Sequence, residues 1–137
     1  MVRNTDMVEE AVNNQSGTQA EANGDVDQAI KAYEKNIKKE IADSFPFDRL
    51  MIIYRKQKRY KDELRVINRG IEVFNDQLER QQQQLLSHTK NKKQLQKLSD
   101  LFGKKTGLTK KNMYVPAPVS KWMKRKEVVL GKIKKTK

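Results

Sequence analysis

The chain has 137 residues, of which 36% are hydrophobic and 34% are charged, and its mean hydropathy is −0.92. This length suffices for one modest domain, and the low hydrophobic fraction predicts a thin core with part of the chain outside it. The absence of cysteine excludes a disulfide framework, a thiol nucleophile and a cysteine-ligated metal site. Residues 1–6 lack the apolar run of a secretory signal, and no apolar stretch is long enough to cross a bilayer. We therefore expect a soluble, cytoplasmic protein.

The net charge of +13 is distributed very unevenly. Residues 1–45 carry 5 Lys/Arg and 9 Asp/Glu, residues 46–87 carry 9 and 6, and residues 88–137 carry 16 and 2. The basic character therefore belongs to the C-terminal third and not to the whole chain. Such an asymmetry indicates an anionic partner for that third.

Residues 1–23 are polar, and their weak apolar stripe is interrupted at 13–17 by Asn, Gln, Ser and Gly. A helix needs a continuous apolar face to pack against a core, and this segment offers little of one. We expect it to be flexible or weakly helical.

Residues 25–43 are a stronger helix candidate. Apolar residues recur there in steps of three and four, and Asp25 or Asp27 can cap the start. The helix is expected to end just before Pro46, because the residue preceding a proline avoids the helical region. Pro46 then suits the first turn of the next helix, with Ser44 as its cap.

Residues 47–57 are expected to form the next helix, which has a wide apolar face, and a turn is expected at 58–59. A further helix starts near Tyr60, and its apolar residues recur every seven residues in a degraded heptad. Two outcomes stay open for its far end. The helix can project as a solvated arm, or it can break near 87–91 and fold back. In either case we expect a helical extension over 88–103.

Residues 104–137 form a basic, Lys-rich tail, which we expect to be mobile. The part from 104 to 118 is a linker, because it combines glycine, prolines and lysines. The part from 120 to 135 can form one more short basic helix, with Trp122, Val129 and Ile133 on one side.

An internal match at an offset of 34 residues relates 24–37 to 58–71. Apolar residues coincide at 26/60, 30/64, 32/66, 33/67 and 37/71. A two-helix unit that stacks on copies of itself needs such a period, because one helix pair cannot bury its apolar face alone.

Both copies of the repeated segment contain residues that are typical of one family of helical repeats. Those of its first copy are Gly24, Asp25, Ala29, Ile30, Tyr33, Glu34, Lys35 and Ile37. Those of its second, nearly whole copy are Phe47, Leu50, Tyr54, Tyr60, Leu64, Gly70 and Ile71. Together, over residues 24–74, they resemble the tetratricopeptide repeat (TPR) family.

The chain also departs from the TPR pattern. Met51 and Lys58 stand where the family usually has glycine, Glu63 stands where alanine is typical, and the first half of the earlier unit agrees only at Gly17. The resemblance implies an all-α fold of antiparallel helix hairpins, with a TPR-like domain over 24–87. A plain helical hairpin or three-helix bundle is the alternative.

No set of catalytic residues is visible. The only histidine, His88, has no acidic or cysteine neighbour and is expected on the solvated surface. The acidic residues near helix starts suit caps and dipole partners better than catalysis. No glycine-rich phosphate loop or zinc pattern is present. We therefore expect a protein that is not an enzyme and needs no cofactor.

The expected function is protein–protein interaction through the helical domain, as an adaptor or scaffold. The resemblance to TPR proteins implies a concave peptide-binding face lined by the first helix of each pair, and on this chain that helix is 47–57. Its candidate partner contacts are Arg49, Ile52, Arg55 and Lys56. In the alternative interpretation, Ile52 is a core residue and the charges are merely solvated.

A module with fewer than two full repeats has little concave surface. We therefore expect docking to a partner, or self-association that completes the stack, more than capture of a peptide. A homodimer is favoured if the face of Phe47 and Ile53, or that of Ile67 and Phe74, is exposed.

The alternative function is sequence-tolerant nucleic-acid binding by the C-terminal region, with the helical core as a dimerisation or scaffold domain. Lysine outnumbers arginine there by 15 to 1, and lysines bind phosphate as point charges, so binding would be salt-sensitive. Trp122 could stack on bases. The candidate contacts are Lys104, Lys105, Lys110, Lys111, Lys121, Trp122, Lys124, Arg125 and Lys126. An acidic protein, a membrane surface or no specific ligand at all are the other interpretations of this tail.

Overall fold

The computed structural model describes residues 4–88, 91–101 and 117–135. Over these residues the chain forms six helices and no strand, which confirms the predicted all-α class. The helices are α1 (Asn4–Ala22), α2 (Val26–Ile37), α3 (Ser44–Lys56), α4 (Tyr60–Ser87), α5 (Lys92–Leu101) and α6 (Ala117–Lys135).

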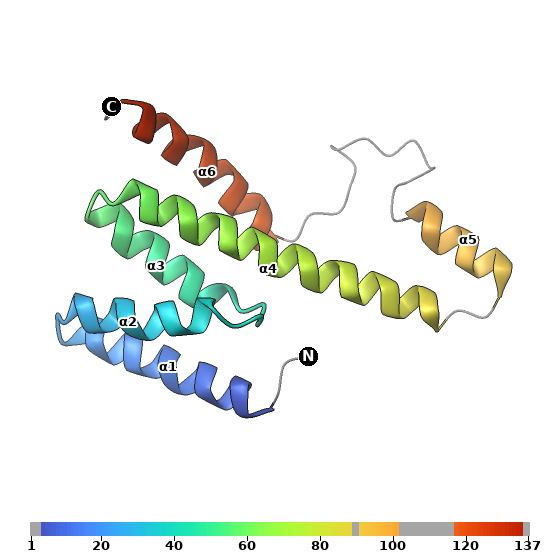
Figure 1. Ribbon diagram of the computed structural model, residues 1–137, viewed down its shortest axis with the longest axis horizontal. Coiled ribbons are helices and arrows are strands. Elements are labelled where there is room, and N and C mark those ends of the chain that lie inside the picture. The colour runs from blue at the N-terminus through green and yellow to red at the C-terminus, as the bar shows by residue number, and fades with distance from the viewer. Residues whose placement is uncertain (1–3, 89–90, 102–116, 136–137) are drawn as a thin grey trace.

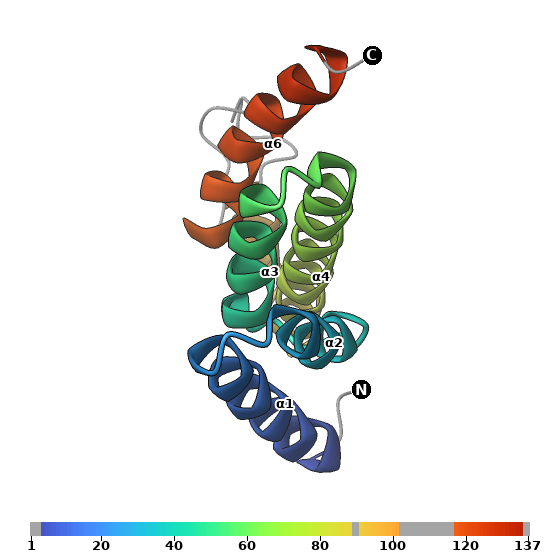
Figure 2. The same cartoon turned by 90° about the vertical axis from the view of Figure 1, so that its left-hand side faces the viewer.

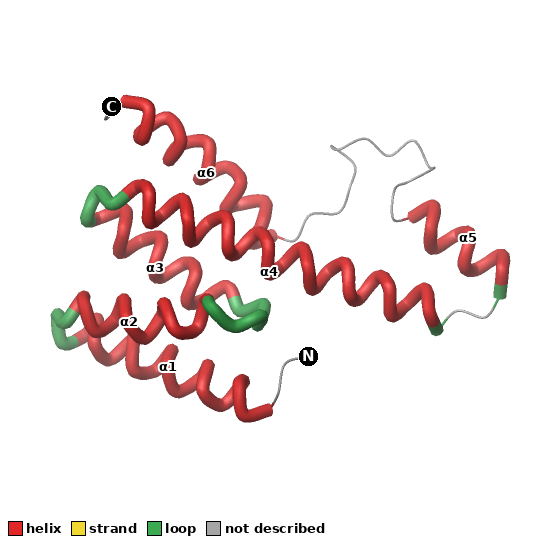
Figure 3. The backbone as a smooth tube through the Cα atoms, in the orientation of Figure 1, coloured by secondary structure: helices red, strands yellow, loops and turns green. Residues whose placement is uncertain are grey.

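Consecutive helices from α1 to α4 run antiparallel, because short loops join them at alternating ends (Figure 1 and Figure 3). α4 continues beyond the other three toward α5, and α6 lies beside the first half of α4. From the end, in Figure 2, α3 is seen between α1 and α6, while α2 and α4 lie on the other side of it. α3 therefore occupies the middle of one helical layer.

One hydrophobic core joins α1, α2, α3, α4 and α6. Its largest fully buried apolar and aromatic side chains are Trp122, Tyr33, Tyr54, Phe47, Leu50 and Ile67. Because Trp122 comes from α6, the C-terminal helix belongs to the same core as the helices that precede it.

The start of α2 is capped as predicted. The Asp25 carboxylate accepts a hydrogen bond from the backbone N–H of Gln28 (3.1 Å). Gly24, in the turn before it, has a φ of +78°, a conformation that glycine adopts without strain. The turn and the cap together fix where α2 begins.

The predicted end of this helix was wrong, since α2 stops at Ile37 instead of running to residue 43. Arg69 of α4 donates hydrogen bonds to the carbonyl oxygens of Ile37 (2.9 Å) and Lys38 (3.0 Å). These acceptors would otherwise be left unsatisfied at the helix end. A side chain more than thirty residues away therefore stabilises this terminus.

α3 begins at Ser44, with Pro46 in its first turn as predicted. Its cap is not Ser44, because the carboxylate of Asp43 accepts the hydrogen bond from the Phe45 N–H (3.1 Å). The turn predicted at 58–59 is confirmed, since it separates α3 from α4.

The N-terminal segment, expected to be flexible or weakly helical over 1–23, forms the full helix α1. Only Glu10, Gly17 and Ala20 are buried in it, so an apolar periodicity could not reveal it. A Cβ built on Gly17 would come within 2.5 Å of the Tyr33 ring. Glycine at this position allows α1 and α2 to approach closely.

Amide side chains also join α1 to α2. The Asn36 amide nitrogen donates to the Glu10 carbonyl oxygen (2.9 Å) and to Asn14 Oδ1 (2.7 Å), and Asn36 Oδ1 accepts from Asn13 (3.0 Å). Asn14 in turn donates to Asp43 Oδ2 (2.9 Å). Buried polar groups of this kind must be hydrogen-bonded, and here they bond to one another. α1 is therefore held by polar contacts as well as by apolar ones.

α4 ends at Ser87, with His88 as its C-cap, so a break near 87–91 is confirmed. The side chains of α4 from residue 75 onward are exposed or half-buried, as expected for an arm that leaves the packed domain. The extension expected over 88–103 contains α5, which lies near the far end of α4 (Figure 1).

The short basic helix expected over 120–135 is present and runs from Ala117 to Lys135, but it is docked on the core and is not part of a mobile tail. This helix, α6, packs on α4 and buries Val119, Trp122 and Val129. The many lysines of α6 occupy its solvent-facing side, and the buried residues occupy the other. Residues 104–116 lie outside the described part of the chain.

Candidate binding surface on α3

α3 buries one face and leaves the other accessible. Its buried residues include Phe47, Leu50, Met51, Ile53 and Tyr54. After its first turn, its accessible residues follow helical spacing and form a single row, which we call the α3 strip: Asp48, Arg49, Ile52, Arg55 and Lys56.

The first edge of the α3 strip is tied to α1 through Glu21. Arg49 donates from Nε to Glu21 Oε2 (3.1 Å) and from Nη2 to Oε1. The Tyr33 hydroxyl donates to the same carboxylate (2.7 Å). Burial raises the pKa of Glu21, but the hydrogen bonds from Arg49 and Tyr33 outweigh it and hold the pKa below its usual value. Glu21 is thus an ionised link between α1, α2 and α3.

The second edge of the α3 strip is tied to α6 through Asp48. The Trp122 indole Nε1 donates to Asp48 Oδ1 (2.8 Å), and the Lys121 ammonium lies 3.2 Å from the same oxygen. The α3 strip therefore lies between α1 and α6, each fixed to it by hydrogen bonds, in agreement with the arrangement in Figure 2.

A buried carboxylate joins α6 to the core behind this edge. Glu63 of α4 has 0% exposure, and it accepts from Arg125 Nε (2.7 Å) and Nη2 (3.1 Å). Arg55 Nε of the α3 strip also reaches Glu63, at 3.4 Å. Sequence reasoning missed Glu63 and Asp48 as structural links. The available signal was Glu63 itself, an acidic residue where the TPR pattern has alanine.

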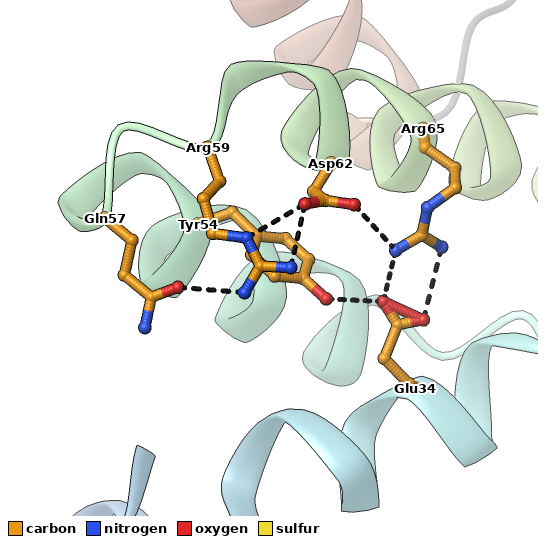
Figure 4. A network of polar contacts seen from close by, with 6 residues as sticks. All are labelled: Glu34, Tyr54, Gln57, Arg59, Asp62 and Arg65. Carbon is orange, nitrogen blue, oxygen red and sulfur yellow. Dashed lines mark hydrogen bonds and ion pairs between the residues drawn. The ribbon is translucent and has the colours of Figure 1, made fainter. Parts of the chain in front are cut away.

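A polar network supports α3 from the side of α2 and α4 (Figure 4). The Tyr54 hydroxyl donates to Glu34 Oε1 (2.7 Å), and Arg65 donates to both oxygens of Glu34. Asp62 accepts from Arg59 (2.9 Å), whose guanidinium lies 4.7 Å from the centre of the Tyr54 ring. Burial and the hydrogen bond to Glu34 raise the pKa of Tyr54, so its hydroxyl keeps its proton and stays a donor.

The four predicted partner contacts all lie on the α3 strip. Arg49 and Arg55 are ion-paired with Glu21 and Glu63. Ile52 is partly buried and Lys56 is exposed. The structure thus brings the predicted residues together, and their role in binding a partner stays a prediction.

The expectation that Trp122 stacks on bases is corrected. Its side chain has 0% exposure, and its ring packs against Phe47 (5.5 Å between centroids) and Phe74 (5.2 Å). Arg125, another predicted nucleic-acid contact, is engaged with Glu63 and only 17% of its side chain is exposed. Trp122 was expected on one side of a short helix, but no local pattern indicated that this helix docks on α4, so both residues were assigned to a ligand.

The other predicted nucleic-acid contacts are divided between two parts of the chain. Lys121 is exposed and pairs with Asp48, Lys124 is exposed, and Lys126 is partly exposed. The remaining four, Lys104, Lys105, Lys110 and Lys111, lie outside the described residues.

The face expected to drive dimerisation is covered within the chain. Phe47, Ile53 and Ile67 are buried in the core, and Phe74 packs against the Trp122 ring. The condition for a homodimer through these faces, that one of them is exposed, is therefore not met.

Over the three described ranges, no group of three or more His, Cys, Asp or Glu side chains is placed to hold a metal ion. In that same part of the chain, no helix is both long enough and apolar enough to cross a membrane. His88 is exposed at the end of α4, as expected.

Comparison with known proteins identifies no relative: the chain matches no protein-family model, no curated protein and no solved structure.

Proposed function

We propose that this protein is a non-enzymatic protein-binding module, in which α1 and α6 on either side of the α3 strip supply the surface for a partner's peptide segment that the short repeat array alone was not expected to provide. The observation that carries the proposal is the position of the strip between two fixed helices. Arg49 bonds to Glu21 on α1, and Asp48 accepts a hydrogen bond from Trp122 on α6. A surface whose two edges are already held loses less conformational freedom when a partner binds.

The positions of the helices support this proposal. α2 begins at Val26 and α4 at Tyr60, which is the spacing of the repeat in the sequence. The equivalent residues Tyr33 and Ile67 both have 0% exposure. In the TPR family, which this pattern resembles, the first helix of each pair lines the peptide-binding face. Here α1 and α3 are the first helices of their pairs.

The chemistry of the α3 strip defines the class of partner. Ile52 supplies a partly accessible apolar contact, and Arg49, Arg55 and Lys56 surround it at helical spacings of three and four residues. Asp48 brings a negative charge and pairs with Lys121, whereas Arg49 and Arg55 pair with Glu21 and Glu63, so Lys56 is the exposed cation of the strip that forms no ion pair within the described residues. The complementary segment has an apolar side chain flanked by Asp or Glu, because opposite charges steer association and fix register.

Nucleic-acid binding by residues 104–137, the alternative function, has weaker support. Of its expected contacts, Trp122 is buried in the core and Arg125 is engaged in an ion pair with Glu63.

A displayed library of random peptides, selected on the immobilised full chain, tests the proposed function. The peptides that are enriched are then labelled, and their affinity is measured by fluorescence anisotropy. We expect them to combine an apolar residue with neighbouring Asp or Glu. Ile52→Asp and Lys56→Glu should each weaken binding by about tenfold or more, which corresponds to roughly 1.4 kcal/mol.

Matched substitutions on α2 serve as controls. Val26→Asp introduces the same charge at a residue with 37% exposure, and Lys31→Glu reverses an exposed lysine. Neither lies on the α3 strip, so both should bind the selected peptides as the wild type does. Failure to enrich any peptide, or equal losses in the strip and control variants, would contradict the proposed function.

A further inference from the structure

A small basic hollow lies at the turn between α3 and α4. It has a volume of about 310 Å³ and is lined by Lys58, Arg59, Tyr60, Lys61, Asp62 and Ile133. The Lys132 ammonium of α6 lies 5.6 Å from the centre of the Tyr60 ring, which is part of this lining. Three cationic side chains therefore line the hollow, and a fourth, from a separate part of the chain, contacts one of its lining rings; we call this region the basic hollow.

The positive charge of the basic hollow is poorly compensated. Its one carboxylate, Asp62, already accepts from Arg59 (2.9 Å) and lies 3.6 Å from Arg65. Lys58 and Lys61 are exposed and form no ion pair within the described residues. Lys132 is exposed as well, and its described contact is the face of Tyr60. A concave surface with excess positive charge concentrates the positive electrostatic potential and attracts an anionic ligand.

The backbone at Lys58 is strained. Lys58 has a φ of 58° and is the only non-glycine residue with positive φ in the described part of the chain. The left-handed conformation costs a residue with a Cβ roughly 1 kcal/mol, a cost that glycine avoids. Strain kept at one position is a reason to look for a function there. The lysine places a cation at the rim of the hollow where glycine would give a more stable turn.

We propose that the basic hollow binds the phosphate backbone of a nucleic acid. Lysines are compact charges that neutralise phosphates without reading base edges. Several of them around an open hollow suit a polymer of phosphates, in which each lysine neutralises a successive charge. The hydrophobic residues of the lining, Tyr60 and Ile133, are both partly buried against the core, so neither projects as an apolar group that would insert into a membrane.

This site differs from the one expected from the sequence. None of Lys58, Arg59, Lys61 and Lys132 was among the predicted nucleic-acid contacts, and α6 contributes Lys132 only because it is docked on α4. The site is also independent of the α3 strip, so either can fail without the other.

Anisotropy of a short fluorescein-labelled single-stranded oligonucleotide, measured with the full chain at several salt concentrations, tests the proposal. Lys61→Ala/Lys132→Ala should weaken binding by about tenfold or more and lower the slope of log affinity against log salt by roughly two. The matched control Lys31→Ala/Lys35→Ala removes the same charge from the exposed side of α2. It should change binding by less than about threefold, since only long-range attraction is lost.

Lys58→Gly separates function from folding. It should raise the thermal midpoint, because the strained backbone is relieved, and should weaken oligonucleotide binding at the same time. Two results would overturn the proposal. The first is equal binding by the wild type and the Lys61→Ala/Lys132→Ala variant, or equal losses in that variant and its control. The second is a chain that binds vesicles of phosphatidylserine and phosphatidylcholine through these lysines but does not bind the oligonucleotide.

Discussion

Glu63 and Arg125, which are 62 residues apart in the sequence, form a two-pronged ion pair between α4 and α6. The Glu63 side chain has 0% exposure, and among the described residues its two ion-pair partners are Arg125 and the more distant Arg55. The buried Glu63 carboxylate therefore ties α6 to the core, together with the contacts that Trp122 and Lys121 make to Asp48. It does so next to the α3 strip, so the docking of α6 and the shape of the proposed binding surface are linked.

Replacement of Arg125 should release α6. Arg125→Ala leaves the Glu63 carboxylate buried with only Arg55 near it, at 3.4 Å. Removing one partner of a buried pair typically costs about 3–5 kcal/mol. We expect a loss toward the lower end of that range, because part of the Arg125 side chain is exposed. Urea unfolding followed by the fluorescence of Trp122, the one tryptophan in the chain, measures the loss.

Lys121→Ala is the control for the Arg125 substitution. Lys121 also bridges α6 to the core, through Asp48, but 64% of its side chain is exposed. Exposed pairs contribute roughly 1 kcal/mol or less. An equal loss of stability in the two variants would show that burial of the Glu63 charge is not what holds α6.

Close packing between α4 and α6 predicts opposite effects for two glycine substitutions. A Cβ on Gly70 would come within 2.8 Å of the Trp122 ring, whereas a Cβ on Gly131 meets nothing within 4 Å. Gly70→Ala should cost about 1–3 kcal/mol through overpacking. Gly131→Ala should add up to about 1 kcal/mol, because alanine favours the helix at an exposed position. Thermal unfolding of both variants checks this contrast, and a stable Gly70→Ala protein would contradict the described packing.

The buried carboxyl of Glu10 predicts a pH dependence of stability. Burial, and then the nearby Asp43, raise the pKa of Glu10 to about 7, against a smaller opposing effect of Lys39. The folded chain therefore holds this proton more tightly than the unfolded chain does. Its contribution to stability is fully present below about pH 4.5 and is lost as the pH rises to about 7.

Urea unfolding between pH 4.5 and pH 8 measures this dependence. The Glu10 contribution should amount to roughly 3 kcal/mol or less over the interval. Glu10→Gln should remove it, while Glu9→Gln, at the exposed neighbouring residue, should keep the wild-type slope. Identical pH profiles for the wild type and Glu10→Gln would refute the role given to this carboxyl.

The contact of Gly17 with Tyr33 predicts how α1 can be detached. Gly17→Ala places a Cβ against the Tyr33 ring, whose nearest carbon atoms would then be only 2.5 Å away. We expect amide hydrogen exchange over α1 to accelerate by about tenfold or more, since a clash of roughly 1–3 kcal/mol opposes docking. Ser16→Ala, at the exposed neighbouring position, should leave exchange unchanged. Equal exchange in both variants would indicate that α1 is not packed on Tyr33.

The local pattern of the sequence suffices for the all-α class, for the starts of α2 and α4 and for the turn between α3 and α4. These features depend on apolar spacing, caps and breaks within a few residues of each other. α1 could not be predicted in this way, because it is held by Gly17 and by the amides around Asn36 and not by an apolar stripe. The end of α2 was missed for a similar reason, since Arg69 of a later helix satisfies its carbonyls.

The candidate site, too, could be predicted from local sequence only in part. The α3 strip follows from helical spacing, so Arg49, Ile52, Arg55 and Lys56 could be placed on one row in advance. The docking of α6 depends on the pairing of Trp122 with Asp48 and of Arg125 with Glu63. Pairs so far apart in the chain have no local signature, and the lysines around Trp122 favoured an interpretation as a solvated tail.

The docking of α6 on α4 is what makes the α3 strip a surface with two fixed edges, and nuclear Overhauser effects measure it most directly. In the isotopically labelled full chain, the Trp122 ring protons should show cross-peaks to the Gly70 α-protons and to the Phe47 and Phe74 rings. A Trp122 ring without such cross-peaks, and with the indole chemical shift of a solvated tryptophan, would contradict the structure on which the proposed function depends.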